Sequence, residues 1–347
     1  MMMNLSCPLP QLDFDTINLG HGSGGTLTSQ LLDAGVFNLF ENDLLNKKHD
    51  GAIFTLNGKV AMSTDTYVVS PIFFEGGNIG DLAINGTVND LAMCGAAAKY
   101  LTLGFVLEEG LKMTEFWEIL LSIKTACQAA GVQIITGDTK VVEKGKGDKI
   151  FINTTGIGQV HAKADIDISN IKAGDQIILS GPLARHGITI VSHRQGLQFE
   201  TTMSSDTRPL NDIILKLLDE FGHQIHFLRD PTRGGLATVL NEIAVQAQLG
   251  ITIAEKNLPV EEEVQGACEM LGFDPLYVAN EGLFIAVVDA AIAQQVLQQI
   301  KQWEFGSMAS LIGEVTAEHP RQVIMKSKIG GRRVVNMLAG EQLPRIC

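Results

Sequence analysis

Cysteines are few and long apolar runs are absent from this sequence, and both shortages exclude classes of protein. The five cysteines among 347 residues lie far apart and form no CxxC pair, so neither a disulfide framework nor a zinc knuckle is predicted. No apolar run approaches the roughly 20 residues that a membrane helix needs. The opening MMMNLSCPLPQLDFD lacks the basic and apolar regions of a signal peptide. We therefore expect a protein of the reducing cytoplasm without a membrane partner.

Basic and aromatic residues are also scarce. The chain carries 39 acidic and 26 basic residues, for a formal net charge of −13, and only 6% of its residues are aromatic. This charge repels phosphate backbones, and the shortage of aromatic rings argues against base stacking, so no nucleic-acid partner is expected. Apolar residues, at 45%, and glycines, at 36, are abundant instead. This balance is typical of a globular chain with sizeable cores.

The pattern of predicted helices and strands restarts near residue 160, which indicates two domains. Both halves mix helices and strands without the regular alternation of a doubly wound sheet, so an α+β fold is expected. We place an N-terminal domain at 1–160, a C-terminal domain at 161–330 and a mobile tail at 331–347. In the first domain, Asn57-Gly58 between two apolar runs predicts a hairpin. Asn78 is expected to cap a helix through NIGDLAINGTVNDLAMCG.

Aspartates stand at the ends of several predicted elements. They are Asp50, Asp65, Asp138 and Asp230, while Asp90 lies inside an apolar helical stretch. Aspartates gathered in this way can hold Mg²⁺ while phosphates fill the remaining coordination positions. The alternative for each is ordinary capping and turn chemistry, except that a buried Asp90 would need a partner.

Glycine clusters interrupt the same regions, with HGSGG at 21–25 and TGD at 136–138. Backbone N–H groups of such loops can approach phosphate oxygens. None of the clusters matches a P-loop or a dinucleotide-binding fingerprint, and each is alternatively a plain turn. Lys140 follows TGD and Glu281 precedes an apolar strand, where a surface lysine and a solvated turn glutamate are the alternatives. The spacing around His186 indicates no catalytic role.

The chain ends in LPRIC, so Cys347 is its last residue. A tail that starts at Gly330 could extend about 56 Å, at roughly 3.3 Å per residue. That reach is enough to carry a thiol between its own domain and a partner. The terminal carboxylate should raise the pKa of the thiol, and Arg345 should lower it. The alternative is a cysteine that simply ends the chain.

Five separated motifs appear in one order and resemble one family. They are HGSGG, STDTYVVSPIFFEGGNIGDLAINGTVNDLAMCGA, TGDTKVVE, RDPTRGGLATVLNEIA and ANEG, followed by a terminal PRIC. From about residue 17 onward the sequence resembles the HypE family of hydrogenase maturation proteins, relatives of aminoimidazole ribonucleotide synthetase, selenophosphate synthetase and thiamine-monophosphate kinase. The resemblance implies two α+β domains with an ATP site between them, dimerisation by joined N-terminal sheets, and a flexible C-terminal tail. The first fifteen residues, including Cys7, lie outside it and are given no role.

The resemblance also implies an activity. A carbamoyl group that HypF delivers to Cys347 is dehydrated with ATP to a thiocyanate. The cyanide then passes to a HypC–HypD complex and becomes a ligand of nickel-iron hydrogenase. Two alternatives stay open: a tail-cysteine carrier without ATP turnover, and a selenophosphate synthetase-like kinase. The latter would want a reactive cysteine, which HGSGG lacks.

The residue roles that the resemblance implies fall into three sets. The sets are Asp50, Asp65, Asp90 and Asp230 for Mg²⁺; Gly22, Gly24, Gly25, Asn89, Gly137, Asp138 and Thr139 for ATP; and Cys347, Lys140 and Glu281 for catalysis. Lys140 and Glu281 are expected to form a proton-relay pair. Whether the tail rests inside or outside the ATP cleft is left open.

Overall fold

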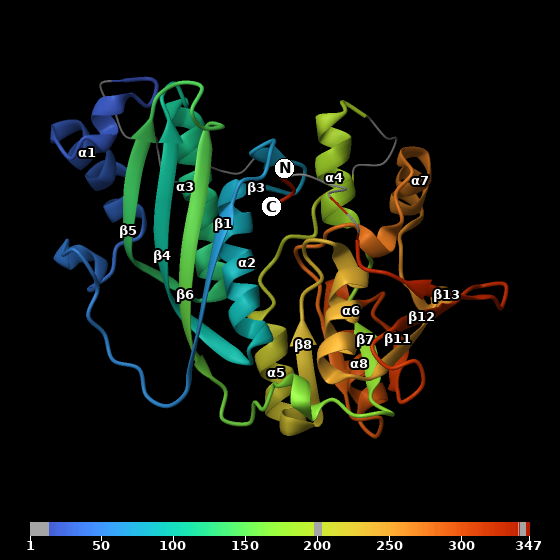
Figure 1. Ribbon diagram of the computed structural model, residues 1–347. Coiled ribbons are helices and arrows are strands. Elements are labelled where there is room, and N and C mark those ends of the chain that lie inside the picture. The colour runs from blue at the N-terminus through green and yellow to red at the C-terminus, as the bar shows by residue number, and fades with distance from the viewer. Residues whose placement is uncertain (1–13, 198–202, 339, 341–344) are drawn as a thin grey trace.

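Two units lie side by side, each built on its own β-sheet (Figure 1). The computed structural model describes residues 14–197, 203–338, 340 and 345–347. The N-terminal unit carries a four-stranded sheet and the C-terminal unit a seven-stranded sheet. Both sheets mix antiparallel and parallel pairs, and helices pack against them. The α+β class and a division near residue 160 agree with this arrangement.

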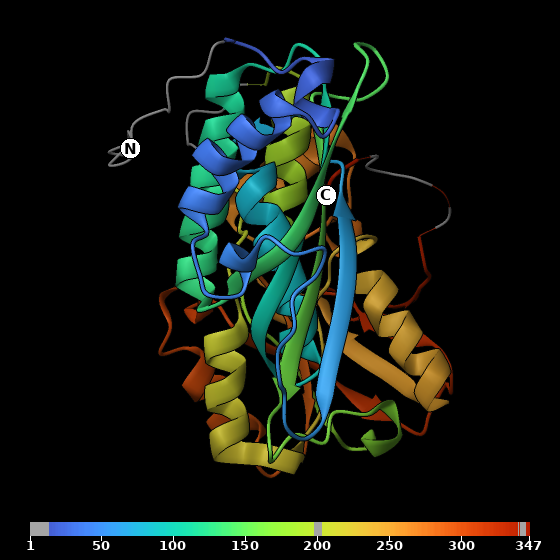
Figure 2. The same ribbon diagram turned by 90° about the vertical axis from the view of Figure 1, so that its left-hand side faces the viewer.

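The N-terminal sheet has the strand order β1-β6-β4-β5, in which only β4 and β5 are parallel. Its strands are β1 (Val60–Tyr67), β4 (Ala96–Glu108), β5 (Gln133–Val142) and β6 (Ile150–Val160). Its other elements are α1 (Thr26–Leu31), the π-helical segment η2 (Leu32–Phe37), the short pair β2 (Phe73–Phe74) and β3 (Gly77–Asn78), α2 (Ile79–Met93) and α3 (Met113–Ala130). Figure 2 shows the helical segment that starts at α1 running beside α3, and η2 contacts α3. One face of the sheet is thereby covered, and β1 and β5 are its edges.

Helix α2 begins where the sequence predicts. The Asn78 side chain accepts a hydrogen bond from the Gly80 N–H at 2.7 Å, and the Asp81 carboxylate accepts from the Asn78 N–H at 2.6 Å. This reciprocal capping box satisfies donors that the first turn of a helix leaves free. Almost every side chain of α2 is buried, because the helix lies between its own sheet and the C-terminal unit, where it contacts α5 and β8.

The C-terminal sheet has the order β13-β12-β9-β11-β7-β10-β8. Its strands are β7 (Gln176–Leu179), β8 (Ile225–Arg229), β9 (Gly250–Ala254), β10 (Ile285–Val288), β11 (Ser310–Thr316), β12 (Val323–Lys326) and β13 (Arg332–Val335). Its helices are α4 (Arg185–Arg194), α5 (Asn211–Phe221), α6 (Gly235–Ala247), α7 (Glu262–Leu271) and α8 (Ala293–Ile300). In the part of the chain just described, no helix has the length and apolarity needed to cross a bilayer.

Two local predictions were wrong. The Asn57-Gly58 hairpin does not form: β1 pairs with β6, Val60 opposite Gln159, and residues 51–59 form no strand. A partner about 100 residues away along the chain thus overrides a local turn signal. The tail also starts later than residue 331, because Arg332–Val335 forms β13 on the edge of the sheet and Val335 is fully buried.

Apolar packing joins the two units. The core of the N-terminal unit includes Ile190 and Val191 from α4, Ala279 from the loop before β10, and Ile346 from the end of the tail. The chain terminus lies between the two units in Figure 1. Residues from three distant parts of the chain therefore pack together where the two units meet.

Helix α2 approaches β1 closely at Gly86, and a substitution there tests this packing. A Cβ at this position would lie 2.2 Å from the hydroxyl oxygen of the buried Tyr67. We expect Gly86→Ala to lower the free energy of unfolding by about 1–3 kcal/mol, the usual cost of overpacking a core.

The matched control is Gly266→Ala in α7, where a Cβ meets no atom within 4 Å. There the change should be neutral or stabilise the protein by up to about 1 kcal/mol, because alanine favours helix over glycine. Urea unfolding of both variants decides the matter. Equal effects at the two positions would contradict the proposed close packing.

Candidate active site

Carboxyl groups from four separate segments lie near one another at the junction of the two units, which is called the cleft below. Asp65 comes from β1, Asp90 from α2, Asp230 from the end of β8, and Glu281 from the loop before β10. Burial raises the pKa of Glu281 well above its usual range, and the charges of these aspartates, together with Asp206, raise it further. These five residues are called the cleft cluster below. Their mutual electrostatic influence shows that three of the four predicted metal ligands are neighbours of Glu281.

Backbone contacts hold Glu281 in this position. Its side chain is only 4% exposed, and its Oε1 atom has no hydrogen-bond partner among the described residues. The Asp206 carboxylate accepts hydrogen bonds from the N–H groups of Glu281, at 3.2 and 3.3 Å, and of Gly282, at 3.1 Å. A Cβ on Gly282 would lie 1.8 Å from the Asp206 carbonyl oxygen, so only glycine fits there. The carboxyl group is thus buried, fixed and left with a free oxygen.

The side chain of Asn280 connects three segments around Glu281. Its side chain is fully buried and donates to the carbonyl oxygens of Pro231, at 2.8 Å, and Val278, at 3.0 Å. Its own oxygen accepts from the Ala184 N–H at 2.7 Å. One side chain therefore ties the Glu281 loop to the loop that follows Asp230 and to the start of α4.

Two aspartates of the cluster, Asp230 and Asp90, also have raised pKa values. Burial raises the pKa of Asp230 to about 7, with Asp90 as the largest charge contribution. Burial likewise raises the pKa of Asp90, although its Oδ2 accepts a 2.5 Å hydrogen bond from the Ser63 hydroxyl. Among the described residues, no group of three His, Cys, Asp or Glu side chains forms a ready metal cage. Mg²⁺ bound with ATP needs only one or two carboxylates, because water and phosphate fill its other positions, so this donor set fits it.

The tail enters this cleft. The Val68 N–H donates to the Cys347 carbonyl oxygen at 3.1 Å, and the Ser70 N–H donates to that of Arg345 at 3.3 Å. Ile346 is buried in the N-terminal core. Burial raises the pKa of the Cys347 thiol, Glu281 and Asp65 raise it further, and Arg233 opposes them. The Cys347 thiol is half-buried and packs against the N-terminal core, and its raised pKa favours the protonated form.

Arg345 anchors the tail to the N-terminal unit. Its guanidinium forms a 2.5 Å ion pair with Asp148 and donates through Nε to the Val68 carbonyl oxygen at 3.1 Å. Arg194, at the end of α4, donates to the carbonyl oxygens of Arg345 and Ser70. The terminal arginine thus binds the N-terminal unit, while a second arginine reaches it from the C-terminal unit.

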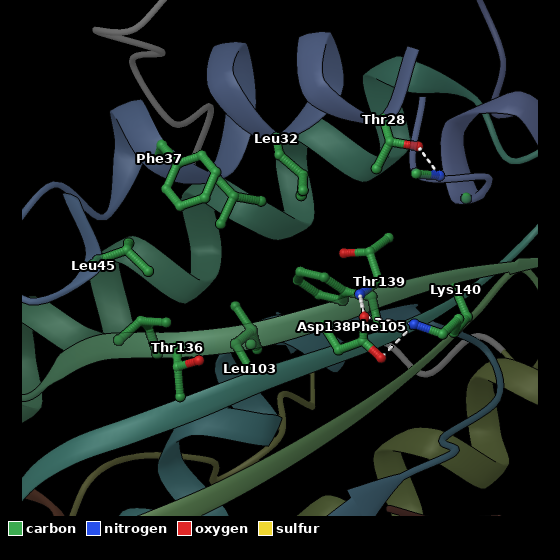
Figure 3. Close-up of a pocket in the computed structure, with 15 residues that line it drawn as sticks. Thr28, Leu32, Phe37, Leu45, Leu103, Phe105, Thr136, Asp138, Thr139 and Lys140 are labelled. Atoms are coloured by element: carbon green, nitrogen blue, oxygen red, sulfur yellow. Dashed lines mark hydrogen bonds and ion pairs between the residues drawn. The ribbon is translucent and has the colours of Figure 1, made fainter. Parts of the chain in front are cut away.

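A second set of predicted residues lines a pocket of about 220 Å³ at the outer edge of the N-terminal sheet. Figure 3 shows Thr28, Leu32 and Phe37 on one side and β5 on the other, with Lys140 bonded to Asp138. The lining includes five predicted site residues, Gly22, Gly24, Gly137, Asp138 and Thr139, together with Lys140. We call this the edge pocket. A Cβ on Gly22 would lie 2.6 Å from the Val141 nitrogen, so the glycine loop needs this residue to approach β5.

The structure does not bring the two sets together within one chain. Lys140 is exposed and pairs with Asp138 at 2.5 Å, and it is not among the charges that act on Glu281. Strand β5 lies at the opposite edge of the sheet from β1 (Figure 1). The predicted Lys140–Glu281 pair is therefore absent within a single chain.

Of three further predicted residues, Asp50 and Gly25 lie apart from the cleft cluster, whereas Asn89 contacts it. Asp50 is exposed, and its neighbours His49 and Gly51 line a second pocket beside β5. Gly25 precedes α1 as its N-cap residue. Asn89 was expected to bind nucleotide, but its amide donates to the carbonyl oxygens of Arg208 and Glu281 and accepts from the Leu210 N–H. Because these bonds use its donors and its acceptor, Asn89 acts here as a link between the units.

Sequence reasoning missed three residues of the cleft. Asp206 holds the Glu281 loop, His186 bonds the tail, and Arg233 acts electrostatically on both Asp90 and Cys347. Arg233 stands inside the quoted motif RDPTRGG, so a positive charge next to Asp230 was a usable signal. Asp206 and His186 carry no local signal, because their partners are distant in sequence.

Comparison with known proteins places the chain among characterised families. Residues 48–160 match the AIR synthase related protein, N-terminal domain, and residues 172–326 match the C-terminal domain of the same family. The carbamoyl dehydratase HypE of Azotobacter vinelandii is 46% identical over 333 residues, covering 96% of this chain and 97% of the relative. The two domain matches confirm the predicted two-domain fold.

Solved structures agree. A crystal structure of the hydrogenase maturation protein HypE in complex with ATP has a TM-score of 0.92 and 46% identity, covering 95% of this chain and 99% of the other. A HypE–HypF complex contains a chain with a TM-score of 0.79 and 42% identity, covering 90% of this chain and 100% of that one.

The raised pKa of Asp230 makes a prediction about stability. Because the folded protein holds this pKa at about 7 instead of 3.8, ionisation of Asp230 opposes folding as the pH rises from about 4 to about 7. Below about pH 4 the carboxyl is protonated in both states and the penalty vanishes. Asp230→Asn should therefore raise the free energy of unfolding by about 2–4 kcal/mol at pH 8, and much less at pH 4.

Denaturant unfolding in magnesium-free buffer at the two pH values measures this effect. Asp50→Asn is the matched control, since Asp50 is exposed and its replacement should change stability little at either pH. An Asp230→Asn variant no more stable than the wild type at pH 8 would show that the buried acid is stabilised by interactions other than its proton.

Proposed function

Since this chain belongs to the HypE family of carbamoyl dehydratases, which use ATP in hydrogenase maturation, we propose that its own Cys347 carries the carbamoyl group. The cleft dehydrates this thiocarboxamide to a thiocyanate, which becomes the cyanide ligand of nickel-iron hydrogenase. One observation carries the proposal: the end of the tail is docked between the two units, bonded to Val68 and His186, where Glu281 raises the pKa of the terminal thiol.

The reaction balances with ATP as the acceptor of water. The carbamoyl oxygen attacks the γ-phosphorus and the bond to ADP breaks, while the amide nitrogen loses one proton. Loss of the second N–H proton then forms C≡N as the C–O bond breaks and phosphate leaves. The sum is thiocarboxamide plus ATP giving thiocyanate, ADP and phosphate. The enzyme must therefore accept two protons and neutralise the phosphate charge.

Glu281 suits the role of proton acceptor once its charge is compensated. Its raised pKa keeps it protonated when only other carboxylates surround it. Positive charge close to Glu281 would lower this pKa and let the carboxylate act as a base. The oxygen without a partner is then available to the amide proton. Asp65, Asp90 and Asp230 would hold Mg²⁺, which when bound offsets the phosphate charge.

We propose that a homodimer completes the site. The face of β1 opposite α2 exposes Val60 by 53% and Met62 by 67%, and apolar exposure on a sheet is typical of an interface. Lys140 pairs in register with Val106, which is also exposed, and residues opposite one another in a sheet share a face. A second copy joined through this face would bring the edge pocket and Lys140 of one chain to the cleft cluster of the other.

Two partner proteins are proposed to meet the thiol at the end of the tail. HypF is proposed as the carbamoyl donor, because a 42% identical relative has been solved in a HypE–HypF complex. A HypC–HypD complex is proposed as the cyanide acceptor. The 12 residues after β13 could extend about 40 Å, so the thiol can leave the cleft to meet either partner and return.

The first prediction of the proposal concerns the thiol. We expect Cys347→Ala to fold normally and to abolish nitrile formation, because the change removes the proposed carrier of the carbamoyl group. After incubation with HypF, carbamoyl phosphate and ATP, mass spectrometry of the wild type should show a carbamoyl adduct and then a species lighter by one water. An adduct on Cys94 or Cys127 instead would refute the mechanism.

The second prediction concerns Glu281 and Lys140. Glu281→Gln and Lys140→Ala should both accept the carbamoyl group yet accumulate undehydrated tail, with dehydration slowed by about 10²–10⁴-fold, the usual contribution of a positioned base. Normal dehydration in either variant would remove that residue from the mechanism.

Mixing the two variants tests the shared site. If Lys140 acts on the partner chain, a mixed dimer contains one intact site and one doubly altered site, so activity returns toward about one quarter of wild type. If both residues act within one chain, the mixture stays inactive. Native mass spectrometry of the mixture, in which the two variants differ in mass, shows whether mixed dimers form.

A further inference from the structure

The carbonyl oxygen of Ile346 has its own hydrogen-bond donor in the cleft. His186, the second residue of α4, approaches this oxygen through Nε2 at 2.8 Å. Ile346 is the residue directly before Cys347, and its side chain is 97% buried by the N-terminal core. The bond therefore acts on the backbone one residue from the reacting group.

The Ile346 carbonyl oxygen determines which ring nitrogen of His186 carries the hydrogen, and the Ser205 hydroxyl is compatible with that choice. Ser205 Oγ accepts a hydrogen bond from the Thr207 N–H at 3.1 Å and lies 2.8 Å from His186 Nδ1. The Ser205 hydroxyl hydrogen is thus free to point at Nδ1, which accepts it. Nε2 must then carry the ring hydrogen and donate it to Ile346, since a carbonyl oxygen can only accept.

The imidazole is held rigidly from both units. It is fully buried and meets the ring of Phe74 edge-on at 5.6 Å. Phe74 belongs to β2 of the N-terminal unit, and the Ser205 N–H donates to the Glu75 carbonyl oxygen at 2.8 Å in the same hairpin. Burial also lowers the pKa of His186, which keeps the ring neutral. A buried imidazole needs hydrogen-bond partners, and the carbonyl oxygen of Ile346 in the tail is one of them.

We infer that His186 is a positioning residue for the dehydration: its Nε2–H holds the Ile346 carbonyl and so keeps the group on Cys347 beside Glu281. The chemical consequence rests on the proposed function, whereas the docking itself does not. The residue acts on the backbone of the tail, and Ser205 satisfies its other ring nitrogen. The same bond protects the free thiol by holding the chain end in the cleft.

Alkylation of the full-length protein with iodoacetamide, mapped by mass spectrometry, tests the docking. His186→Gln places an amide N–H near the position of Nε2, whereas His186→Asn reaches only the position of Nδ1. We expect His186→Ala and His186→Asn to speed alkylation of Cys347 by about fivefold, the factor that one net hydrogen bond of typical strength represents. His186→Gln should stay close to wild type.

The chain's other cysteines are internal controls. Cys94 is exposed and should react alike in all variants, whereas Cys127 and Cys268 are buried and should remain unreactive. A parallel rise at Cys127 and Cys268 would mean general unfolding and would overturn the inference, as would an alanine variant that protects Cys347 as well as the wild type does. If the alanine variant cannot be purified, the Gln and Asn pair still decides.

A single-turnover assay separates this inference from the proposed function. After HypF-dependent carbamoylation at an unchanged rate, His186→Ala and His186→Asn should lose water about fivefold more slowly than wild type and His186→Gln. Equal rates in all four proteins would refute the positioning role. A wild-type chain that accepts the carbamoyl group but never loses water would refute the proposed function, and the alkylation result would still stand by itself.

Discussion

Burial of several carboxyl groups in one cleft is the constraint on which the rest of this structure depends. Glu281 is 4% exposed and has one oxygen without a partner, a state that costs free energy in the folded protein. The fold tolerates it because Asn280 and Asp206 fix the backbone on both sides of Glu281. In the proposed function, such a buried carboxyl would serve as a base once positive charge enters with the nucleotide.

The docked tail combines a defined position with reversible binding. Its carbonyl oxygens accept hydrogen bonds from Val68, Ser70 and His186, each worth about 0.5–1.5 kcal/mol net. Burial of Ile346 adds about 1.5–3 kcal/mol. Ordering of the tail residues opposes these gains by about 1–2 kcal/mol for each backbone residue. The gains and the ordering cost oppose each other, as the proposed exchange of the tail between the cleft and a partner requires.

Local sequence signals predicted the elements well and their contacts less well. Asn78 caps α2 as expected, because a capping box involves residues three apart. Lys140, Glu281 and the aspartates were identified through their motifs, but their grouping was not, since β5 and β1 lie at opposite edges of one sheet. Asn89 was given a nucleotide role from its motif, whereas its amide is used by two carbonyl oxygens more than 100 positions away.

The sequence by itself determined the chemistry that is available: a thiol at the chain end, acids at element ends, and the motifs that identify the family. The tertiary structure alone decided which of these groups meet. It placed Cys347 inside the cleft, added Asp206 and His186 to the site, and separated Lys140 from Glu281 within one chain. The physical reason is that burial, hydrogen-bond partners and pKa shifts depend on neighbours in space, and in this fold those neighbours come from distant parts of the chain.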